Sequence, residues 1–111
     1  MFFKKKNRNV DCEVRVLFDI LADNLRDGLC TDILFLADGK QHRFGAWGDA
    51  GNTYKNVVFY LDEQEYQSEE TLHEHAQIDG VKLAEYNTLV TVTECDGCYP
   101  ESTPRLKALM K

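Results

Sequence analysis

Apolar residues recur every three or four positions over residues 10–27, which is the spacing of an amphipathic helix. One broad stripe, at about 100° per residue, contains Val10, Val14, Leu17, Phe18, Leu21 and Leu25. Gly28 is placed to end this helix, because glycine readily adopts the left-handed conformation. We predict that the stripe faces a hydrophobic core, since burial of each large apolar side chain contributes about 1.5–3 kcal/mol.

A second set of apolar residues in this segment lies off the stripe. Val16 and Ile20 share the side of the predicted helix that carries Glu13 and Asp27. We expect them to contact a second element of the same fold, and contact with another chain is the alternative. Val16 and Ile20 are therefore candidate interaction residues, and a homodimer formed through this helix stays open.

The middle of the chain has patterns typical of β-strands. Residues 31–37 are apolar on both faces, which predicts a well-covered strand. Asp38-Gly39 follows and is a strong signal for a two-residue hairpin turn. The remaining elements predicted here are strands at 40–47 and 54–61, a glycine-containing loop at 45–52 between them, a tight turn at 62–64, and residues 65–66 completing that hairpin.

Helical and strand signals alternate in the last third of the chain. Ser68 followed by two glutamates predicts a capped helix that ends near Gln77. A second short helical piece is predicted to start at Asp79 and stop at Asn87. The β-branched run at 88–94 predicts a strand, and Thr103-Pro104 predicts the start of a final helix that reaches Met110.

Strands grouped in the middle with helices at both ends predict an α+β domain. We expect a mostly antiparallel sheet of about four strands, with the N-terminal amphipathic helix packed on it. Short helices come before and after the last strand. A small bent barrel with helical additions is the alternative. The predicted organisation is a basic flexible tail over residues 1–9 and a single domain over residues 10–111.

The charge distribution narrows the choice of partners. The 111 residues carry a formal charge of −6, and four of the 13 basic residues lie within residues 1–8. Nucleic-acid binding depends on clustered lysine and arginine, and the chain after residue 8 is strongly acidic. We therefore predict no nucleic-acid partner. The densest acidic stretch is Asp62, Glu63, Glu65, Glu69, Glu70 and Glu74. Such a stretch is typical of a solvated face, and a docking surface for a basic protein partner is the alternative interpretation. Glu63, Glu69 and Glu70 are the candidate contacts of that docking surface.

Hydropathy and cysteine content bear on the compartment. The chain is 43% hydrophobic, which is enough for a core, but no apolar run approaches the ~20 residues of a membrane-spanning helix. We therefore expect no stable membrane association. Four cysteines without an export signal predict free thiols and a cytoplasmic location.

The pair Cys95 and Cys98 forms the sharpest local motif. A CxxC pair can supply half of a tetrahedral zinc site, so a zinc-stabilised domain is one alternative function. Two further ligands are needed, and His73 and His75 diverge on the predicted helix. We favour free cysteines flanking a turn built on Asp96-Gly97, and expect no cofactor.

The glycine loop at 45–52 lacks the spacing of a dinucleotide site. Trp47 and Tyr54 in and beside it are candidate aromatic contacts of the kind enriched in binding hot spots. An enzyme with a site under this loop is the other alternative, and it requires a pocket that joins His42 or a cysteine to a carboxylate. We predict no catalytic residues. The sequence as a whole favours a small acidic cytoplasmic protein that acts as a protein-interaction module.

Overall fold

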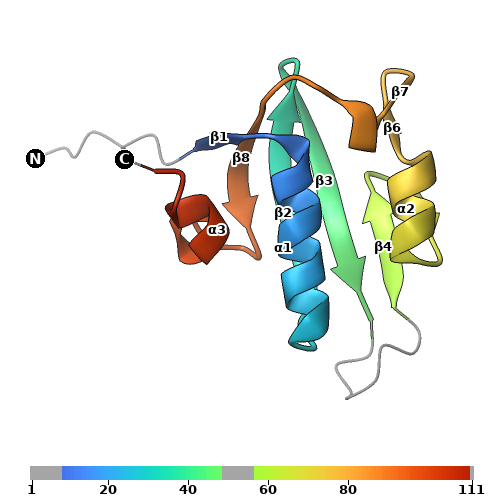
Figure 1. The fold of residues 1–111 in the computed structure, drawn as a ribbon, viewed down its shortest axis with the longest axis horizontal. Coiled ribbons are helices and arrows are strands. Elements are labelled where there is room, and N and C mark those ends of the chain that lie inside the picture. Colours follow the sequence, from blue (N-terminus) through green and yellow to red (C-terminus); the bar gives the residue numbers. More distant parts are fainter. Residues whose placement is uncertain (1–8, 49–56, 111) are drawn as a thin grey trace, which may run out of the picture.

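A six-stranded sheet, in which all neighbouring strands are antiparallel, forms the centre of the molecule (Figure 1). The computed structural model describes residues 9–48 and 57–110. The strand order is β1-β8-β2-β3-β4-β5. The bounds are β1 Val10–Cys12, β2 Thr31–Ala37, β3 Lys40–Trp47, β4 Val58–Leu61, β5 Gln64–Tyr66 and β8 Val90–Cys95.

Helices lie over one face of this sheet, and a small hairpin accompanies them. Helix α1 crosses in front of β2, and α2 lies beside β4 (Figure 1). The helices are α1 Val14–Arg26, α2 Glu69–His75 and α3 Pro104–Lys107, with single 3-10 turns η1 Leu83–Glu85 and η2 Pro100–Ser102. The hairpin is β6 Gln77–Ile78 and β7 Val81–Lys82. The predicted α+β class and helix-on-sheet packing are thus confirmed in outline, with six strands instead of about four.

The start of the chain differs from the helix predicted over residues 10–27. Residues Val10–Cys12 form the edge strand β1, which pairs with β8 so that Val10 faces Val92. Glu13 has an extended backbone, and the helix begins only at Val14. Val10 and Cys12 both point inward, as alternate residues of a strand do. Two inward positions are too few to distinguish this alternation from the start of a helical stripe. Gly28, with a φ of 74°, ends α1 as predicted.

The short helical piece predicted from Asp79 to Asn87 is present only as the 3-10 turn η1, and its predicted start at Asp79 is wrong. Asp79 and Gly80 have φ values of 51° and 81°, and they form the turn between β6 and β7. This conformation belongs to tight hairpins, in which both turn residues are left-handed. The Ser68 cap, by contrast, is confirmed, because its hydroxyl accepts a hydrogen bond from the Thr71 amide at 3.0 Å.

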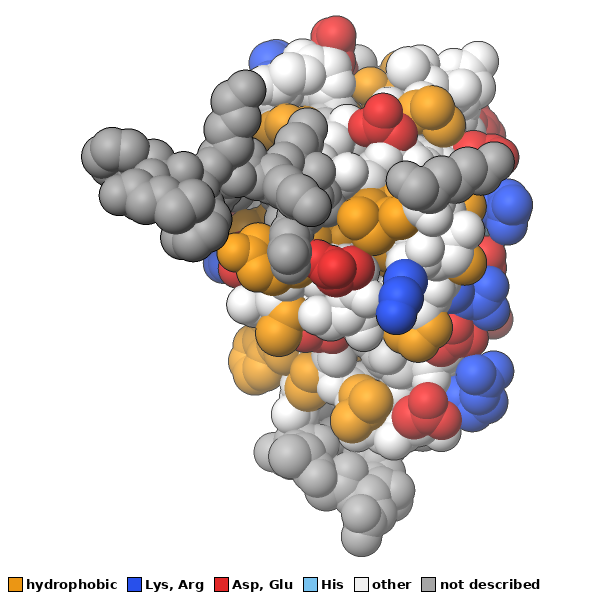
Figure 2. Space-filling view, turned by 90° about the vertical axis from the view of Figure 1, so that its left-hand side faces the viewer, with side chains coloured by type: hydrophobic (Ala, Val, Ile, Leu, Met, Phe, Trp, Pro, Cys, Tyr) orange, Lys and Arg blue, Asp and Glu red, His pale blue; other side chains and the backbone are white. Residues whose placement is uncertain are grey.

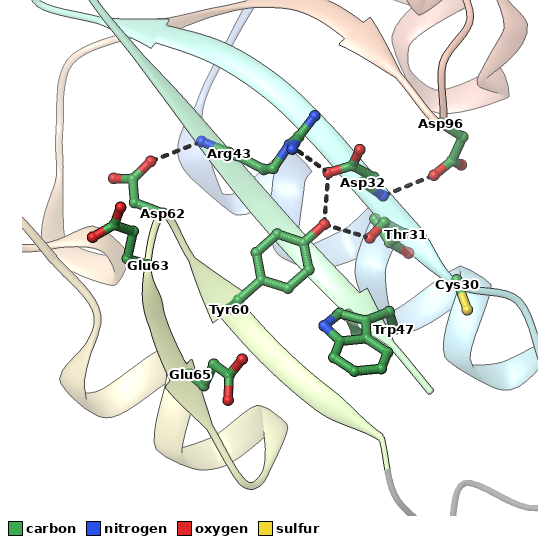
Figure 3. Close-up of a pocket in the computed structure, with 11 residues that line it drawn as sticks. Cys30, Thr31, Asp32, Arg43, Trp47, Tyr60, Asp62, Glu63, Glu65 and Asp96 are labelled. Atoms are coloured by element: carbon green, nitrogen blue, oxygen red, sulfur yellow. Dashed lines mark hydrogen bonds and ion pairs between the residues drawn. The ribbon is translucent and has the colours of Figure 1, made fainter. Parts of the chain in front are cut away.

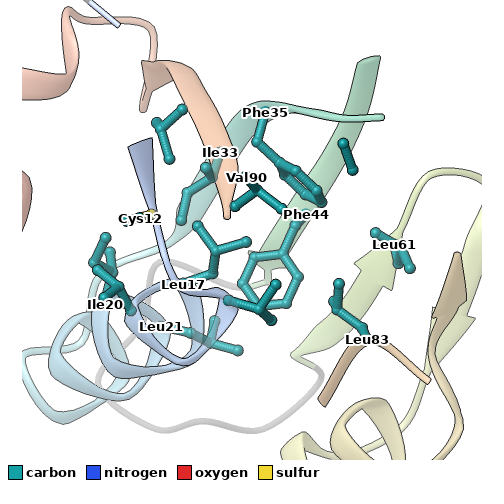
Figure 4. Close-up of a cluster of buried hydrophobic side chains, with 14 of the residues drawn as sticks. Cys12, Leu17, Ile20, Leu21, Ile33, Phe35, Phe44, Leu61, Leu83 and Val90 are labelled. Carbon is teal, nitrogen blue, oxygen red and sulfur yellow. The ribbon is translucent and has the colours of Figure 1, made fainter. Parts of the chain in front are cut away.

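The core lies between the helices and the sheet. Figure 4 shows Leu17 and Leu21 of α1 pointing toward Phe44 on β3. Val16 is 8% exposed and Ile20 is 1% exposed, so both belong to the same core. They contact the interior of this fold, as expected, and offer no surface for pairing two copies through the helix.

Ion pairs fasten the C-terminal helix α3 to α1. Arg105 on α3 pairs with Asp19 and Asp23 on α1, and its hydrogen bonds to Asp23 hold the pKa of that carboxyl below its usual value. Figure 2 shows Lys and Arg side chains gathered along one edge of the molecule among acidic ones. None of the described helices is long and apolar enough to cross a membrane.

Candidate functional site

The two faces of the sheet differ in what covers them. Helices α1 and α2 pack on one face, whereas no α-helix within residues 9–48 and 57–110 covers the other, which we call the outer face. Side chains of successive strand residues alternate between the faces. The outer face carries Asp32, Leu34 and Leu36 on β2, Arg43, Gly45 and Trp47 on β3, Tyr60 on β4, Glu65 on β5 and Thr91 on β8.

One row of the outer face is organised around a glycine. Asp32 pairs with Gly45 across β2 and β3, and Gly45 pairs with Tyr60 across β3 and β4. A Cβ on Gly45 would lie 2.0 Å from the Thr31 carbonyl oxygen and 2.9 Å from the Tyr60 hydroxyl. Glycine is therefore required at this position, because the Thr31 carbonyl and, less severely, the Tyr60 hydroxyl fill the space that a side chain would need.

The Tyr60 hydroxyl is the centre of the polar cluster on this face. It donates a hydrogen bond to Oδ1 of Asp32 at 2.6 Å and lies 3.3 Å from the Thr31 carbonyl oxygen. Burial raises the pKa of Tyr60, and the hydrogen bond to Asp32 raises it further because it favours the neutral phenol. The phenol is therefore a fixed donor at physiological pH.

Arg43 continues the cluster from Asp32 toward the turn between β4 and β5. Its Nε lies 3.2 Å from Oδ1 of Asp32, and its backbone amide donates to Oδ1 of Asp62 at 3.0 Å. The other oxygen of Asp62 accepts from Nδ1 of His42 at 2.7 Å. The carboxylates of Asp32 and Asp62 thus have partners within the fold, which holds them in place.

The predicted turn at Asp96-Gly97 is confirmed, with φ values of 55° and 77°. It docks on the end of β2 through two reciprocal bonds. The Asp32 amide donates to Oδ1 of Asp96 at 2.8 Å, and the Asp96 amide donates to the Asp32 carbonyl at 2.7 Å. Burial raises the pKa of Asp96. The turn thereby borders the outer face next to Asp32.

The residues of the polar cluster and the Asp96 turn line an open pocket of about 450 Å³ on the outer face (Figure 3). That volume lies in the usual range of ligand pockets. Trp47, with 55% of its surface exposed, forms one wall. The ionised groups that line it are five carboxylates and one guanidinium: Asp32, Asp62, Glu63, Glu65, Asp96 and Arg43. The pocket is thus aromatic on one side and acidic at its rim.

The CxxC pair takes no part in this pocket. Cys95 is buried, and the Thr103 hydroxyl donates to its sulfur at 3.0 Å. Burial raises the pKa of the Cys95 thiol to about 11, which disfavours the thiolate that binds zinc. Cys98 is exposed. Among the described residues, no three His, Cys, Asp or Glu side chains gather in a way that could hold a metal ion.

The pocket does join one cysteine to carboxylates, as the alternative of an enzyme under the glycine loop requires. Cys30 lines the pocket, but His42 does not. Strand β2 begins just after Cys30, with Thr31 opposite Ala46, whereas His42 is paired with Phe35 further along the same two strands. Cys30 and His42 are therefore separated, as expected from their spacing. The ring of His42 instead stacks on Phe35 with centroids 5.5 Å apart.

The other residues predicted as contacts fall in different places. Glu63 lines the same pocket as Trp47, next to Asp62 (Figure 3), whereas Glu69 and Glu70 line a smaller pocket of about 230 Å³ with Phe18 and His73. The acidic stretch is therefore divided between two surfaces. Tyr54 lies outside the described residues.

Sequence reasoning missed Asp32, Arg43 and Tyr60 as site residues, and it placed Glu65 in the acidic stretch without naming it as a contact. These residues come from different strands, and the register between the strands brings them side by side. No local motif marks them in the sequence. The signal that was available is Gly45 within a strand, since an internal glycine often marks close approach of another group. Comparison with protein-family models, with curated proteins and with solved structures finds no match to this chain.

Proposed function

We propose that this protein is a protein-interaction module without catalytic activity, and that it binds a basic polypeptide through the outer face of its sheet. The observation that carries the proposal is the exposed Trp47 beside a carboxylate-rimmed pocket, on the sheet face that the described helices leave uncovered. Exposed tryptophans are enriched among the residues that dominate binding energies.

Charge supports a basic partner over a neutral or acidic one. The chain has 19 acidic and 13 basic residues, and the pocket rim is more acidic still, with five carboxylates and one guanidinium. Complementary charge speeds encounter and suppresses wrong partners. The same field repels the phosphates of nucleic acids. The four cysteines are free thiols, which favours a reducing compartment such as the cytoplasm.

A peptide selection tests this function. The protein would be used to select binders from a random peptide library, and the selected peptides would be measured against the wild type and Trp47→Ala. We expect peptides with net positive charge that lose at least tenfold in affinity with Trp47→Ala, as is typical of hot-spot residues.

The matched control is Leu109→Ala, because Leu109 is also a large exposed apolar residue, at 47%, but follows α3. This variant should bind the peptides as the wild type does, and circular dichroism should show that both variants are folded. Failure to enrich any peptide, or equal binding by Trp47→Ala and wild type, would contradict the proposed docking surface.

A further inference from the structure

The pocket on the outer face contains two carboxylates that the fold itself does not use. Asp32, Asp62 and Asp96 each hold a partner within the molecule. Glu63 and Glu65, by contrast, have no hydrogen bond or ion pair to the described residues, and both line the pocket with Trp47. Within residues 9–48 and 57–110 no cation pairs with these two carboxylates, so they can neutralise an external cation.

The aromatic groups stand where such a cation would lie. Figure 3 shows Glu65 on β5 below the ring of Tyr60, which is on β4, with Trp47 on β3 at the other side of that ring. Glu65 and Tyr60 are directly paired across β5 and β4. Tyr60 is in turn paired with Gly45 on β3, and Trp47 lies two residues after Gly45, opposite Val58. The tryptophan face is the best aromatic partner for a cation, which it attracts from within about 6 Å of the ring centroid.

The far side of the pocket is already occupied by a cation. The guanidinium of Arg43 pairs with Asp32, and Asp32 also receives the Tyr60 hydroxyl. The carboxylates on this side already have partners within the fold, whereas the carboxylates of Glu63 and Glu65 remain for a second cation. The cluster around Asp32 therefore acts as a fixed wall, and it leaves the side next to Trp47 as the place for an incoming charge.

We infer that the space between Trp47 and Glu65 binds one cationic side chain, a lysine or arginine presented by the basic polypeptide partner. This inference rests on the proposed function and names the anchor that the docking surface recognises. The ammonium or guanidinium group stacks against the indole and pairs with Glu65, while Glu63 adds charge at the rim. The remaining polypeptide runs over the outer face.

The test uses the fluorescence of Trp47, which is the only tryptophan of the chain and therefore reports on this pocket alone. The probes are four Gly-Ser heptapeptides with a single central Arg, Lys, Gln or Glu, titrated into the full chain at matched ionic strength. We expect a saturable change with the Arg and Lys peptides and none with the Gln and Glu peptides. The relative affinities of the first two decide which cation is preferred.

Two variants with the same change in charge separate a specific pocket from general attraction. Glu65→Gln should weaken the Arg or Lys peptide about two- to fivefold, as loss of one exposed ion pair would. Glu70→Gln, on α2 and outside this pocket, should leave the affinity unchanged. Raising the salt from about 0.01 M to 0.15 M should weaken binding, because the screening length falls from about 30 to 8 Å.

Three results would overturn the inference: no saturation with any cationic peptide, an equal response to the Gln peptide, or equal losses in Glu65→Gln and Glu70→Gln. If library peptides depend on Trp47 while the Arg and Lys heptapeptides do not bind, the docking surface stands and the cation anchor fails. If neither set binds, the proposed function fails as well.

Discussion

Phe44 and Trp47 lie three residues apart on β3 and on opposite faces of the same sheet. Phe44 has no exposed surface and packs edge-on against Phe18, with ring centroids 5.2 Å apart. Trp47 has 55% of its surface exposed and borders a pocket rimmed by carboxylates. Two large aromatic side chains on one strand therefore serve different ends, because α1 covers one face and no described helix covers the other.

The comparison extends to how each face is held together. The inner face is stabilised by non-directional burial of apolar area. The outer face depends on directed bonds, above all those of the Tyr60 hydroxyl to Asp32 and of Asp96 to the end of β2. Apolar packing fixes the fold, whereas a polar network fixes the geometry of the face that the described helices leave uncovered.

Truncating the two aromatic residues should separate the faces most clearly. Phe44→Ala should lower the free energy of unfolding by about 3–5 kcal/mol, because it leaves a cavity in the core. Trp47→Ala should lower it by less than about 1 kcal/mol, since its side chain is largely exposed. Urea titration followed by circular dichroism measures both. Similar losses in the two variants would show that Trp47 is part of the core and not of a docking surface.

Adding one methyl group at Gly45 should be the next most damaging change. The new Cβ would lie 2.0 Å from a backbone oxygen that cannot move without shifting β2. We expect Gly45→Ala to cost about 3 kcal/mol, at the upper end of overpacking effects, and to displace Tyr60 from Asp32. Thermal unfolding measures the loss.

Gly80→Asn is the control for this substitution. Gly80 has open space around it, and asparagine tolerates its left-handed backbone. We expect only a small change in the melting temperature of this variant. An unchanged melting temperature in Gly45→Ala would mean that β2 and β3 adjust readily, and that the row from Asp32 to Tyr60 is not rigid.

Removing the Tyr60 hydroxyl should have a smaller effect. Tyr60→Phe loses the hydrogen bond to Asp32 but leaves Arg43 as a partner for that carboxylate. The expected loss of stability is about 1 kcal/mol. Tyr66→Phe is the matched control, because no hydrogen bond joins the Tyr66 hydroxyl to the described residues. Equal unfolding free energies for the two variants would remove Tyr60 from the centre of the cluster.

The buried and the exposed cysteines can be compared by chemical labelling, with no change to the sequence. Cys12 and Cys95 are buried, and Cys30 and Cys98 are exposed. A thiol reagent at pH 8 should label two cysteines rapidly, and mass spectrometry should identify them as Cys30 and Cys98. Rapid labelling of all four would contradict the burial of the inner pair.

The same thiols predict how stability depends on alkaline pH. Burial raises the pKa of both Cys12 and Cys95 from 9.0 to about 11. The unfolded thiols therefore ionise first, and stability that is complete below pH 9 should fall as the pH rises toward 11. Cys95→Ser and Cys12→Ser, compared by urea titration at pH 7 and pH 10.5, should each show a weaker pH dependence than the wild type.

Turn signals illustrate how far local reasoning reaches. Asp38-Gly39 and Asp96-Gly97 were predicted as turns, and both adopt the left-handed pair of conformations. Asp79-Gly80 has the same two residues and the same conformation, yet the segment was predicted to be helical. Its strands have only two residues each, and a period of two cannot be detected in so short a segment. In all three cases the chemistry of the turn was the more reliable signal.

The local conformation of much of this chain follows from neighbouring residues. The bounds of β2 and β3, the Ser68 cap and the Gly28 stop depend on propensity, hydrophobic period and hydrogen bonds within a few positions. Trp47 is a candidate contact residue on the same kind of local evidence, since the signal is the glycine-containing segment around it.

The arrangement of the site depends on contacts between distant residues. Tyr60 meets Asp32 across 28 positions and Asp96 meets Asp32 across 64, through the register of β2, β3, β4 and β8. Val10–Cys12 became an edge strand only because β8, some 80 residues later, was there to pair with it. Register and coverage arise when whole faces are buried together, so no local pattern could specify which side of the sheet would stay open.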